Sequence, residues 1–228
     1  MSEPAVSALI PVHDGEEFLG AALESVLAQT HAPAEVVVVD NASSDRSVEI
    51  AREFGDPVRV VEEPRPGILL ARNACLEAAS GEYFAFLDHD DLWEPTKTEL
   101  QLAAFAADPG LDLVLGQIVQ FTDGIDDERA ARIRIPHGPQ PGRHLNTVLA
   151  PRATWERIGP WDPGSGVADG LVWFIRVAEL GMRQRMLDEV VARRRIHRGN
   201  RSFDNHADRG EWIQVLKASL DGRREQSR

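Results

Sequence analysis

Runs of apolar residues alternate with amphipathic segments through the first half of the chain. The runs are continuous and rich in β-branched residues, which is typical of strands that are buried on both faces. Between the runs, apolar residues recur at the three- and four-residue spacing of a helix with one buried stripe. This pattern predicts strands at residues 6–12, 35–40, 58–61 and 83–88, and helices at residues 18–27, 45–54 and 68–79.

Two consequences follow for the first half of the chain. Continuous apolar strands joined by crossover helices predict an α/β fold with a mostly parallel sheet, covered by helices on both faces. The pair Asp14 and Glu17 has the spacing of a capping box, so we expect it to cap the first helix.

The second half is less regular and predicts a smaller, mixed region. Residues 123–142 are charged, with Pro and Gly at the far end, and we expect a mobile loop there. We expect one domain with a first half at residues 1–105, a second half at 106–205 and a C-terminal helix and tail at 206–228. The pattern predicts helices at residues 97–107, 152–158, 169–180 and 209–220, and strands at 111–121 and 190–197.

Composition narrows the class of protein. The 228 residues carry 25 Lys and Arg against 37 Asp and Glu, a net charge of −12 that argues against a nucleic-acid partner. The single cysteine, Cys75, excludes a disulfide framework within the chain. We find no apolar stretch of membrane-spanning length and no signal-peptide pattern, so we expect a cytoplasmic protein.

Polar residues follow three of the predicted strands. His13 comes after the first strand, Asp40 and Asn41 stand at the end of the second, and Asp88 ends the fourth. Ligands of open parallel sheets bind beyond the C-terminal ends of the strands, so these residues predict a binding site at one edge. The alternative for each residue is a turn or a helix cap.

The acidic run at residues 86–91, FLDHDD, is the sharpest feature. Three carboxylates in four residues repel one another, and a divalent cation removes that cost. Mg²⁺ and Mn²⁺ prefer oxygen ligands and combine one or two carboxylates with the phosphates of a substrate. The alternative is a solvated acidic turn.

Several strings of this sequence together resemble family 2 glycosyltransferases, which have the GT-A fold. The resemblance runs from about residue 6 to about residue 202. It is carried by the order and spacing of VSALIPVHDGEEFLGAALESVLAQT, EVVVVDNASSD, GILLARNACLEAASGEYFAFLDHDD, WERIGPWD and RRIHRGNRS.

The resemblance implies a metal-dependent site, with the nucleotide-sugar bound by the half at residues 1–105 and the acceptor by the half at residues 106–205. Asp88-His89-Asp90 matches the D-x-D motif, which makes Asp90 a metal ligand and Asp88 its partner. His197 matches a further metal ligand or phosphate contact, and a neutral imidazole suits Mn²⁺ better than Mg²⁺. The nucleotide-binding positions that the resemblance implies are Pro11, His13, Asp40, Asn41, Arg72 and Asp88.

The resemblance does not fix which nucleobase the site binds. Family members often have an acid where this chain has Asn41, and an amide both donates and accepts hydrogen bonds. The resemblance implies a UDP-sugar first, and the departure at Asn41 counts against uridine and leaves dTDP- and GDP-sugars open.

The resemblance also implies a general base at the start of the helix at residues 169–180. Asp169 aligns with the first acid of the family's pair, and Gly170 stands where the second acid would be. Asp162 is the fallback. The alternative for Asp169 is a helix N-cap.

Five arginines lie within nine residues near His197, which reverses the acidic balance locally. Guanidinium groups match phosphate oxygens, so we expect at most two of the five, Arg195 and Arg198, to hold the diphosphate. The alternative is that they face solvent or pair with acids elsewhere. The five are Arg193, Arg194, Arg195, Arg198 and Arg201.

Together these features predict an inverting glycosyltransferase that moves a sugar from a nucleoside-diphosphate-sugar to an acceptor hydroxyl, with Mn²⁺ or Mg²⁺. The acceptor is a glycan, a lipid-linked compound or a small molecule, and peripheral contact with a membrane stays open. One alternative is a domain that binds a nucleotide-sugar without turning it over. A sugar nucleotidyltransferase fits less well, because PVHDGEE replaces the glycine-rich, basic loop after the first strand.

Overall fold

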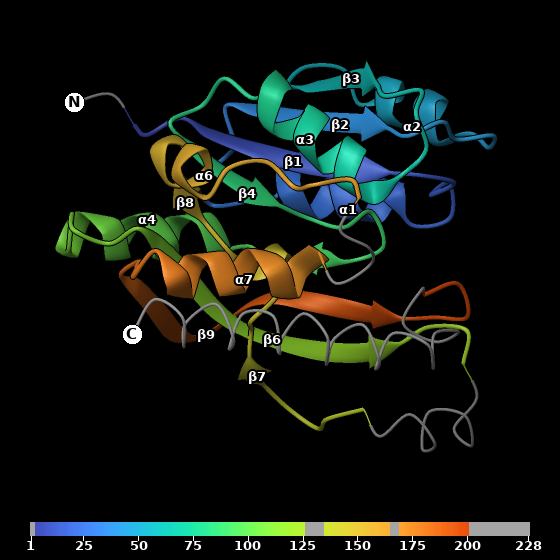
Figure 1. The fold of residues 1–228 in the computed structure, drawn as a ribbon. Helices are drawn as coiled ribbons and strands as arrows, with labels where there is room; N and C mark the ends of the chain where they lie inside the picture. Colours follow the sequence, from blue (N-terminus) through green and yellow to red (C-terminus); the bar gives the residue numbers. More distant parts are fainter. Residues whose placement is uncertain (1–2, 126–134, 165–168, 201–228) are drawn as a thin grey trace.

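The computed structural model describes residues 3–125, 135–164 and 169–200, and these ranges form two sheets flanked by helices (Figure 1). The first sheet has the spatial order β3 (Val58–Glu62), β2 (Glu35–Asp40), β1 (Val6–Val12), β4 (Tyr83–Phe86) and β8 (Ala150–Pro151). The second has the order β5 (Leu92–Trp93), β9 (Gln184–Ile196), β6 (Leu113–Thr122) and β7 (Gln140–Pro141).

The predicted parallel sheet is confirmed. β1 pairs in parallel with β2 and with β4, so that Leu9 lies opposite both Val37 and Phe86. β3 adds to β2 in parallel, and the short β8 pairs with β4 in the antiparallel direction. In the second sheet, β6 and β9 are parallel neighbours, while β5 and β7 lie antiparallel at its edges.

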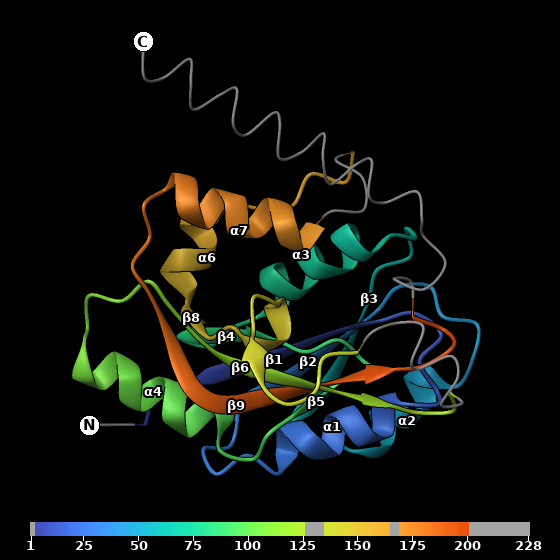
Figure 2. The same ribbon diagram turned by 90° about the horizontal axis from the view of Figure 1, so that it is seen from below.

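Helices cover both faces of the first sheet, as Figure 2 shows from below. Successive residues of β1 face opposite ways, so Ala8 and Ile10 belong to one apolar cluster and Leu9 to the other. The first cluster includes residues of α1 (Leu19–Leu27), α2 (Ser47–Glu53) and α4 (Lys97–Ala107). The second includes residues of α3 (Ile68–Ala78), α6 (Arg152–Ile158) and α7 (Asp169–Glu179).

The cluster under α3, α6 and α7 is built on large aromatic rings. Trp155 of α6 lies with its ring centroid 4.8 Å from that of Trp173 on α7 and 5.2 Å from that of Phe86 on β4. These rings join the helices of the second half to a strand of the first. Cys75 of α3 is fully buried in the same cluster, and burial raises the pKa of its thiol.

The expected capping box at the start of α1 is wrong. Phe18 is the N-cap residue and makes no side-chain cap, while the backbone N–H groups of Phe18 and Leu19 donate to the Gly15 carbonyl. Asp14 instead accepts a 2.7 Å hydrogen bond from the backbone N–H of Ser44. The acid therefore serves a loop that is distant in the sequence rather than its own helix.

Some expectations fall outside the described residues. They are the helix at residues 209–220, the C-terminal segment at 206–228, Arg201 and residues 126–134 of the predicted loop. None of the helices within the described ranges has both the length and the apolar character of a membrane span.

Candidate functional site

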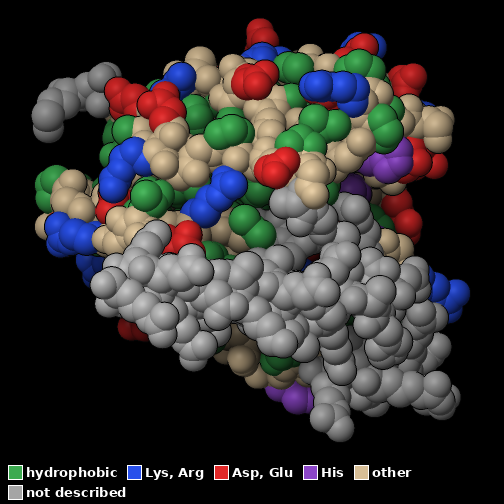
Figure 3. Space-filling model, viewed as in Figure 1, with side chains coloured by type: hydrophobic (Ala, Val, Ile, Leu, Met, Phe, Trp, Pro, Cys, Tyr) green, Lys and Arg blue, Asp and Glu red, His purple; other side chains and the backbone are tan. Residues whose placement is uncertain are grey.

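A cavity of about 1030 Å³ opens at the C-terminal ends of β1, β2 and β4. The segment that follows β9 closes its other side, so both halves of the chain contribute to it. Figure 3 shows histidine and acidic side chains next to each other at the right-hand edge of the molecule, the end toward which these strands run in Figure 1. Lining residues named in the sequence predictions are Pro11, His13, Asn41, Arg72, Asp88, Asp90, His197 and Arg198.

The backbone turns sharply where β1 and β2 end. Asp14 has φ of 49° and Ala42 has φ of 59°, values that residues with a β-carbon rarely adopt. Hydrogen bonds to the start of α2 and the residues just before it hold the first of these turns. The backbone N–H groups of Asp14, Gly15 and Glu16 donate to Ser43 Oγ at 3.0 Å, Ser47 Oγ at 2.8 Å and Asp45 Oδ2 at 2.8 Å.

Asn41 fixes a wall of the cavity. Its Nδ2 donates to the carbonyls of Glu63 at 3.0 Å and Arg65 at 2.7 Å, and its Oδ1 accepts from the N–H of Gly67 at 2.7 Å. Only an amide supplies two donors and an acceptor here, which explains why no acid stands at this position. Because the protein uses both N–H donors, neither is offered to a ligand in this arrangement. The contact of Asn41 with a nucleobase stays a prediction.

Asp40 and His13 flank Asn41 but differ in access to the cavity. Asp40 is buried and accepts a 3.3 Å hydrogen bond from the N–H of Ser43, and it is not among the described residues that line the cavity. The imidazole of His13 lines the cavity, and its Nδ1 lies 2.8 Å from the Asn41 carbonyl. The nucleotide-binding role of each residue stays a prediction.

The acidic run forms a tight turn after β4. Asp88 receives a 3.2 Å hydrogen bond from the buried guanidinium of Arg72. Burial by itself raises the pKa of Asp88, but the charge of Arg72, followed by His144 and His89, brings it below its ordinary value. Asp88 is therefore ionised at neutral pH.

Asp90 and His197 meet although 107 residues separate them in the sequence. His197 Nε2 lies 3.1 Å from Asp90 Oδ2, and Asn200 Nδ2 donates to the same oxygen at 3.0 Å. Both side chains are largely buried, with 18% of Asp90 and 13% of His197 exposed. The structure thus brings together two predicted metal ligands, and their role as ligands stays a prediction.

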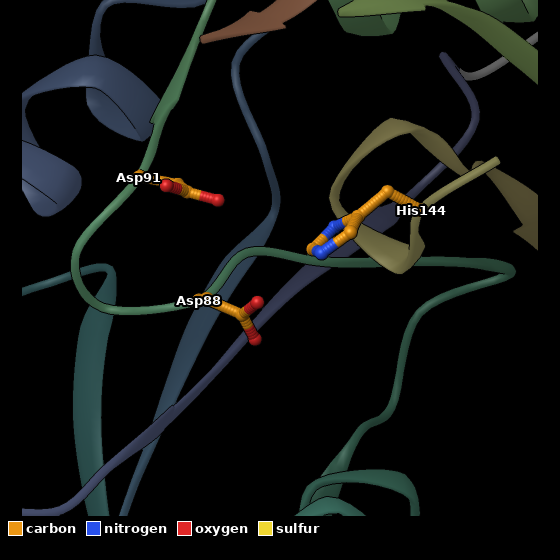
Figure 4. A group of neighbouring side chains, drawn as sticks. All are labelled: Asp88, Asp91 and His144. Carbon is orange, nitrogen blue, oxygen red and sulfur yellow. The ribbon is translucent and has the colours of Figure 1, made fainter. Parts of the chain in front are cut away.

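His144 is a site residue that the sequence reasoning missed. Its imidazole and the carboxylates of Asp88 and Asp91 point into a common space in Figure 4, with one potential ligand atom from each within 4.8 Å of the others. His144 precedes the short 3-10 helix η1 (Leu145–Thr147), where no motif marks it. Carboxylates and imidazoles together are a donor set that suits Mn²⁺ or Mg²⁺.

Arg195 has other partners than the predicted diphosphate. Its guanidinium lies between the rings of Phe18 and Phe121, with the guanidinium carbon 4.7 Å and 4.9 Å from their centroids. It forms an ion pair with Asp123 and donates from Nε to the Asp90 carbonyl at 3.0 Å. Arg195 is not among the described residues that line the cavity, and its contact with a diphosphate stays a prediction. Arg194 and Arg198 do line the cavity.

The predicted base lies at the edge of what the structure describes. Asp169 is the first residue of α7, and its side chain is outside the described part. The fallback, Asp162, is exposed and accepts a 2.9 Å hydrogen bond from the N–H of Gly164. Asp162 is not among the described residues that line the cavity. The assignment of Asp169 stays a prediction.

Comparison with known sequences finds relatives that are named glycosyltransferases. An uncharacterised glycosyltransferase of Rickettsia typhi is 38% identical over 99 residues, which cover 43% of this chain and 31% of the relative. A relative from Rickettsia felis is 27% identical over 238 residues, covering 95% of this chain and 38% of the relative. The Escherichia coli UDP-Glc:alpha-D-GlcNAc-diphosphoundecaprenol beta-1,3-glucosyltransferase WfgD is 38% identical over 105 residues, covering 45% of this chain and 42% of WfgD.

The fold is also similar to that of solved structures. Staphylococcus aureus TarS residues 1–349, in complex with UDP-GlcNAc, align with a TM-score of 0.68 and 21% identity over 94% of this chain and 65% of that one. The mannosyltransferase PcManGT of Pyrobaculum calidifontis, in complex with GDP-Man and Mn²⁺, aligns with a TM-score of 0.66 and 22% identity over 99% of this chain and 65% of that one. At these identities the likeness shows the fold, a mixed α/β arrangement similar to GT-A glycosyltransferases.

The family assignment rests on the sequence itself. The family model described as glycosyl transferase family 2 matches residues 7–161, more than half of the chain. The chain spans less than half the length of each of the three sequence relatives named above. The match to the family model covers the parallel strands of the first sheet from residue 7 on, the acidic turn and η1. The chain therefore belongs to glycosyl transferase family 2.

Proposed function

We propose that the protein transfers a sugar from a nucleoside-diphosphate-sugar to an acceptor hydroxyl, with inversion at the anomeric carbon. The observation that carries the proposal is the 3.1 Å contact of Asp90 with His197 beside the ionised Asp88, at the strand ends of a family 2 fold. The cavity there, about 1030 Å³, has the size of a site for a small-molecule ligand.

The donor set fits a divalent cation. Asp88, Asp90 and His197 would hold Mn²⁺ or Mg²⁺. Asp91 and His144, each with a potential ligand atom within 4.8 Å of one on Asp88, offer further ligands. Such a cation, when bound, supplies positive charge for the phosphate oxygens of the donor. The Mn²⁺ bound by PcManGT supports this choice.

The nucleoside lies, in this proposal, against the wall that Asn41 fixes. Pro11 and His13 line the same part of the cavity, and Arg72 approaches it from α3. TarS binds UDP-GlcNAc, and WfgD is named for UDP-Glc, which support a UDP-sugar first. PcManGT binds GDP-Man, so GDP stays open, as does dTDP.

The remaining roles follow from charge and position. Arg198, which lines the cavity next to His197, would contact the diphosphate as it leaves with the nucleotide. Asp169 would take the proton of the acceptor hydroxyl, which then attacks the anomeric carbon from the face opposite the leaving diphosphate. The acceptor is a glycan, a lipid-linked compound or a small molecule.

Thermal unfolding in the presence of ligands tests the proposal. UDP, GDP and dTDP are each added with Mn²⁺, with Mg²⁺ or with a chelator, and the midpoint temperature Tm is measured. We expect one of the three nucleotides to raise Tm in the presence of a cation, since a ligand at 100 times its Kd stabilises the folded state by about 2.7 kcal/mol. If no nucleotide raises Tm under any of these conditions, the proposal is wrong.

Asp90→Asn is the matched variant for the cation. It keeps the shape of the side chain and removes its charge, so we expect the cation-dependent rise in Tm to fall by more than half. The control is Asp108→Asn, because Asp108 forms an exposed ion pair with Arg183 away from the cavity. If the Asp90→Asn protein shows the full cation-dependent rise in Tm, Asp90 is not a ligand of the cation.

A domain that binds the donor without transferring it remains the second candidate. Gly170, the second residue of α7, carries no carboxylate where family members have an acid, and this favours the candidate. Nucleotide binding with neither sugar transfer nor donor hydrolysis would support it. If the protein does transfer, Asp169→Asn is expected to lower the rate by at least 100-fold, and a near-normal rate would require another base. Membership of family 2 argues against the nucleotidyltransferase alternative.

A further inference from the structure

Asn146 lies at the centre of η1 and is completely buried beneath the acidic turn. Its Nδ2 donates to Asp91 Oδ2, and its Oδ1 accepts a 3.1 Å hydrogen bond from the backbone N–H of Asp88. One amide therefore contacts the first and the last acid of the run. Among the described hydrogen bonds, no other side chain bonds to both Asp88 and Asp91.

η1 is itself held from the opposite side. The indole Nε1 of Trp93 donates to the Asn146 carbonyl at 3.1 Å. From α4, Gln101 Nε2 donates to the Thr147 carbonyl at 2.7 Å, and Lys97 Nζ to the Val148 carbonyl at 3.3 Å. All three donors are buried, so Asn146 is presented to the acids from a rigid support.

Asp91 is also fixed from a second direction. Its Oδ1 accepts a 2.8 Å hydrogen bond from the backbone N–H of Arg195 on β9, while Oδ2 faces Asn146. The turn is thus held at Asp88 and Asp91, and Asp90 between them is directed at His197. A carboxylate in place of Asn146 would have no N–H to donate to Asp91, and an apolar side chain would leave the Asp88 N–H and one oxygen of Asp91 without partners.

We propose that Asn146 is a positioning residue that keeps the turn at residues 88–91 in its cation-binding conformation. Through this turn it sets the affinity of the site for the cation and, with the cation, for the nucleotide. This inference rests on the proposed function, because it concerns the same site. Residues that orient metal ligands typically change metal affinity by 10- to 100-fold when they are removed.

The experiment compares two isosteric variants of buried amides. Asn146→Leu removes both hydrogen-bonding groups with little change in volume. Gln29→Met is the control, because the Gln29 amide is buried and donates to the carbonyls of Ser25 at 3.2 Å and Glu94 at 2.8 Å. Gln29 is not among the described residues that line the cavity.

The readout is binding rather than turnover. Mn²⁺ is titrated into the protein at a fixed concentration of UDP, or of whichever nucleoside diphosphate raises Tm in the thermal experiment. The apparent Kd of Mn²⁺ is measured by calorimetry. We expect Asn146→Leu to raise this Kd at least tenfold and to leave cation-free nucleotide affinity within twofold. Gln29→Met is expected to lower Tm but to keep the Kd of Mn²⁺ within twofold of the wild type.

The outcomes separate the two proposals. A wild-type protein that binds no nucleotide with Mn²⁺ contradicts the proposed function. A wild type that binds, with a folded Asn146→Leu protein that binds Mn²⁺ equally well, overturns the positioning role alone. Asn146→Ser, which keeps one hydroxyl, covers the case in which the leucine variant does not fold. Its Kd is expected to rise threefold to tenfold, and an unchanged Kd would also overturn the inference.

Discussion

Amide side chains hold one wall of the cavity and the acidic turn, at two positions where acids would fail. Asn41 needs two donors and an acceptor for the segment before α3, and Asn146 needs one of each for the acidic turn. A carboxylate has no donor when it is ionised, so neither position tolerates an acid without breaking a buried hydrogen bond. Neither position therefore adds negative charge beside the acidic run at residues 86–91.

Glu35, at the start of β2, predicts a measurable dependence of stability on pH. Burial raises its pKa, but hydrogen bonds from Ser7, Ser80 and Arg59 lower it more, to about 2 from a reference of 4.5. The unfolded state therefore binds an extra proton between these values. Stability from Glu35 is present above pH 4.5 and is lost as pH falls toward 2.

We expect Glu35→Gln to lower the free energy of unfolding by about 2 kcal/mol at pH 6. The difference from wild type should shrink as pH falls below 4.5. Urea unfolding at several pH values measures it, with Glu53→Gln on the exposed side of α2 as the control. An equal difference at pH 6 and pH 3 would contradict the role of the ionised carboxylate.

At the level of single residues, sequence reasoning found those that a strand end or a motif marks. Asp90 and His197 are such residues, and they meet in the structure. His144 and Asn146 were missed, because η1 has no strand or helix pattern and its contacts with the acids are made by tertiary packing. The packing of Arg195 between two aromatic rings was not predicted, because a strand of alternating arginines does not reveal which one is enclosed.

Among the helices, α4 carries a buried lysine that faces no carboxylate among the described ion pairs. Lys97 Nζ donates to Gln101 Oε1 at 2.6 Å and lies 4.6 Å from the centroid of the Trp93 ring. Burial lowers the pKa of Lys97 to about 7 from a reference of 10.5. Between these values the unfolded state binds the extra proton, so stability rises with pH.

We expect Lys97→Met to remove this dependence. Relative to the variant, wild type should gain about 2 kcal/mol in the free energy of unfolding between pH 7 and pH 9. Urea unfolding of both proteins at the two pH values is the measurement. A constant difference between wild type and variant would show that Lys97 does not change its protonation in this range.

Helices and strands were predicted correctly where apolar residues recur at regular spacing along the sequence. The helices at residues 97–107 and 152–158 match α4 and α6 at both ends. β9 begins at Gln184, six residues before the predicted strand, because exposed residues such as Asp188 and Glu189 interrupt its apolar pattern. The cap predicted for α1 is absent because Asp14 bonds to Ser44, in a loop that is close in space and distant in the sequence.

For the whole molecule, the two halves share one core. The cluster under α1 contains Val6 and Ile10 of the first half together with Val114 and Leu187 of the second. Trp155 joins β4 to α6 on the other face. The boundary near residue 105 therefore does not separate two independent cores.

We accordingly expect a single unfolding transition. Urea curves from far-ultraviolet circular dichroism and from tryptophan fluorescence should have the same midpoint, because the described tryptophans pack against both halves. Separate midpoints would mean that one half unfolds alone. The parallel sheet itself was predictable, because continuous β-branched strands with intervening helices leave few other arrangements.

Cys75, the only thiol in the chain, is buried, so its rate of chemical labelling measures how often α3 moves away from the sheet. A thiol reagent reaches it only when α3 separates from the sheet. Arg72 lies one turn before Cys75 on the same helix and contacts Asp88. A nucleotide bound with Mn²⁺ should therefore slow labelling severalfold at a site that it never touches, and an unchanged rate would mean that α3 opens independently of the cavity.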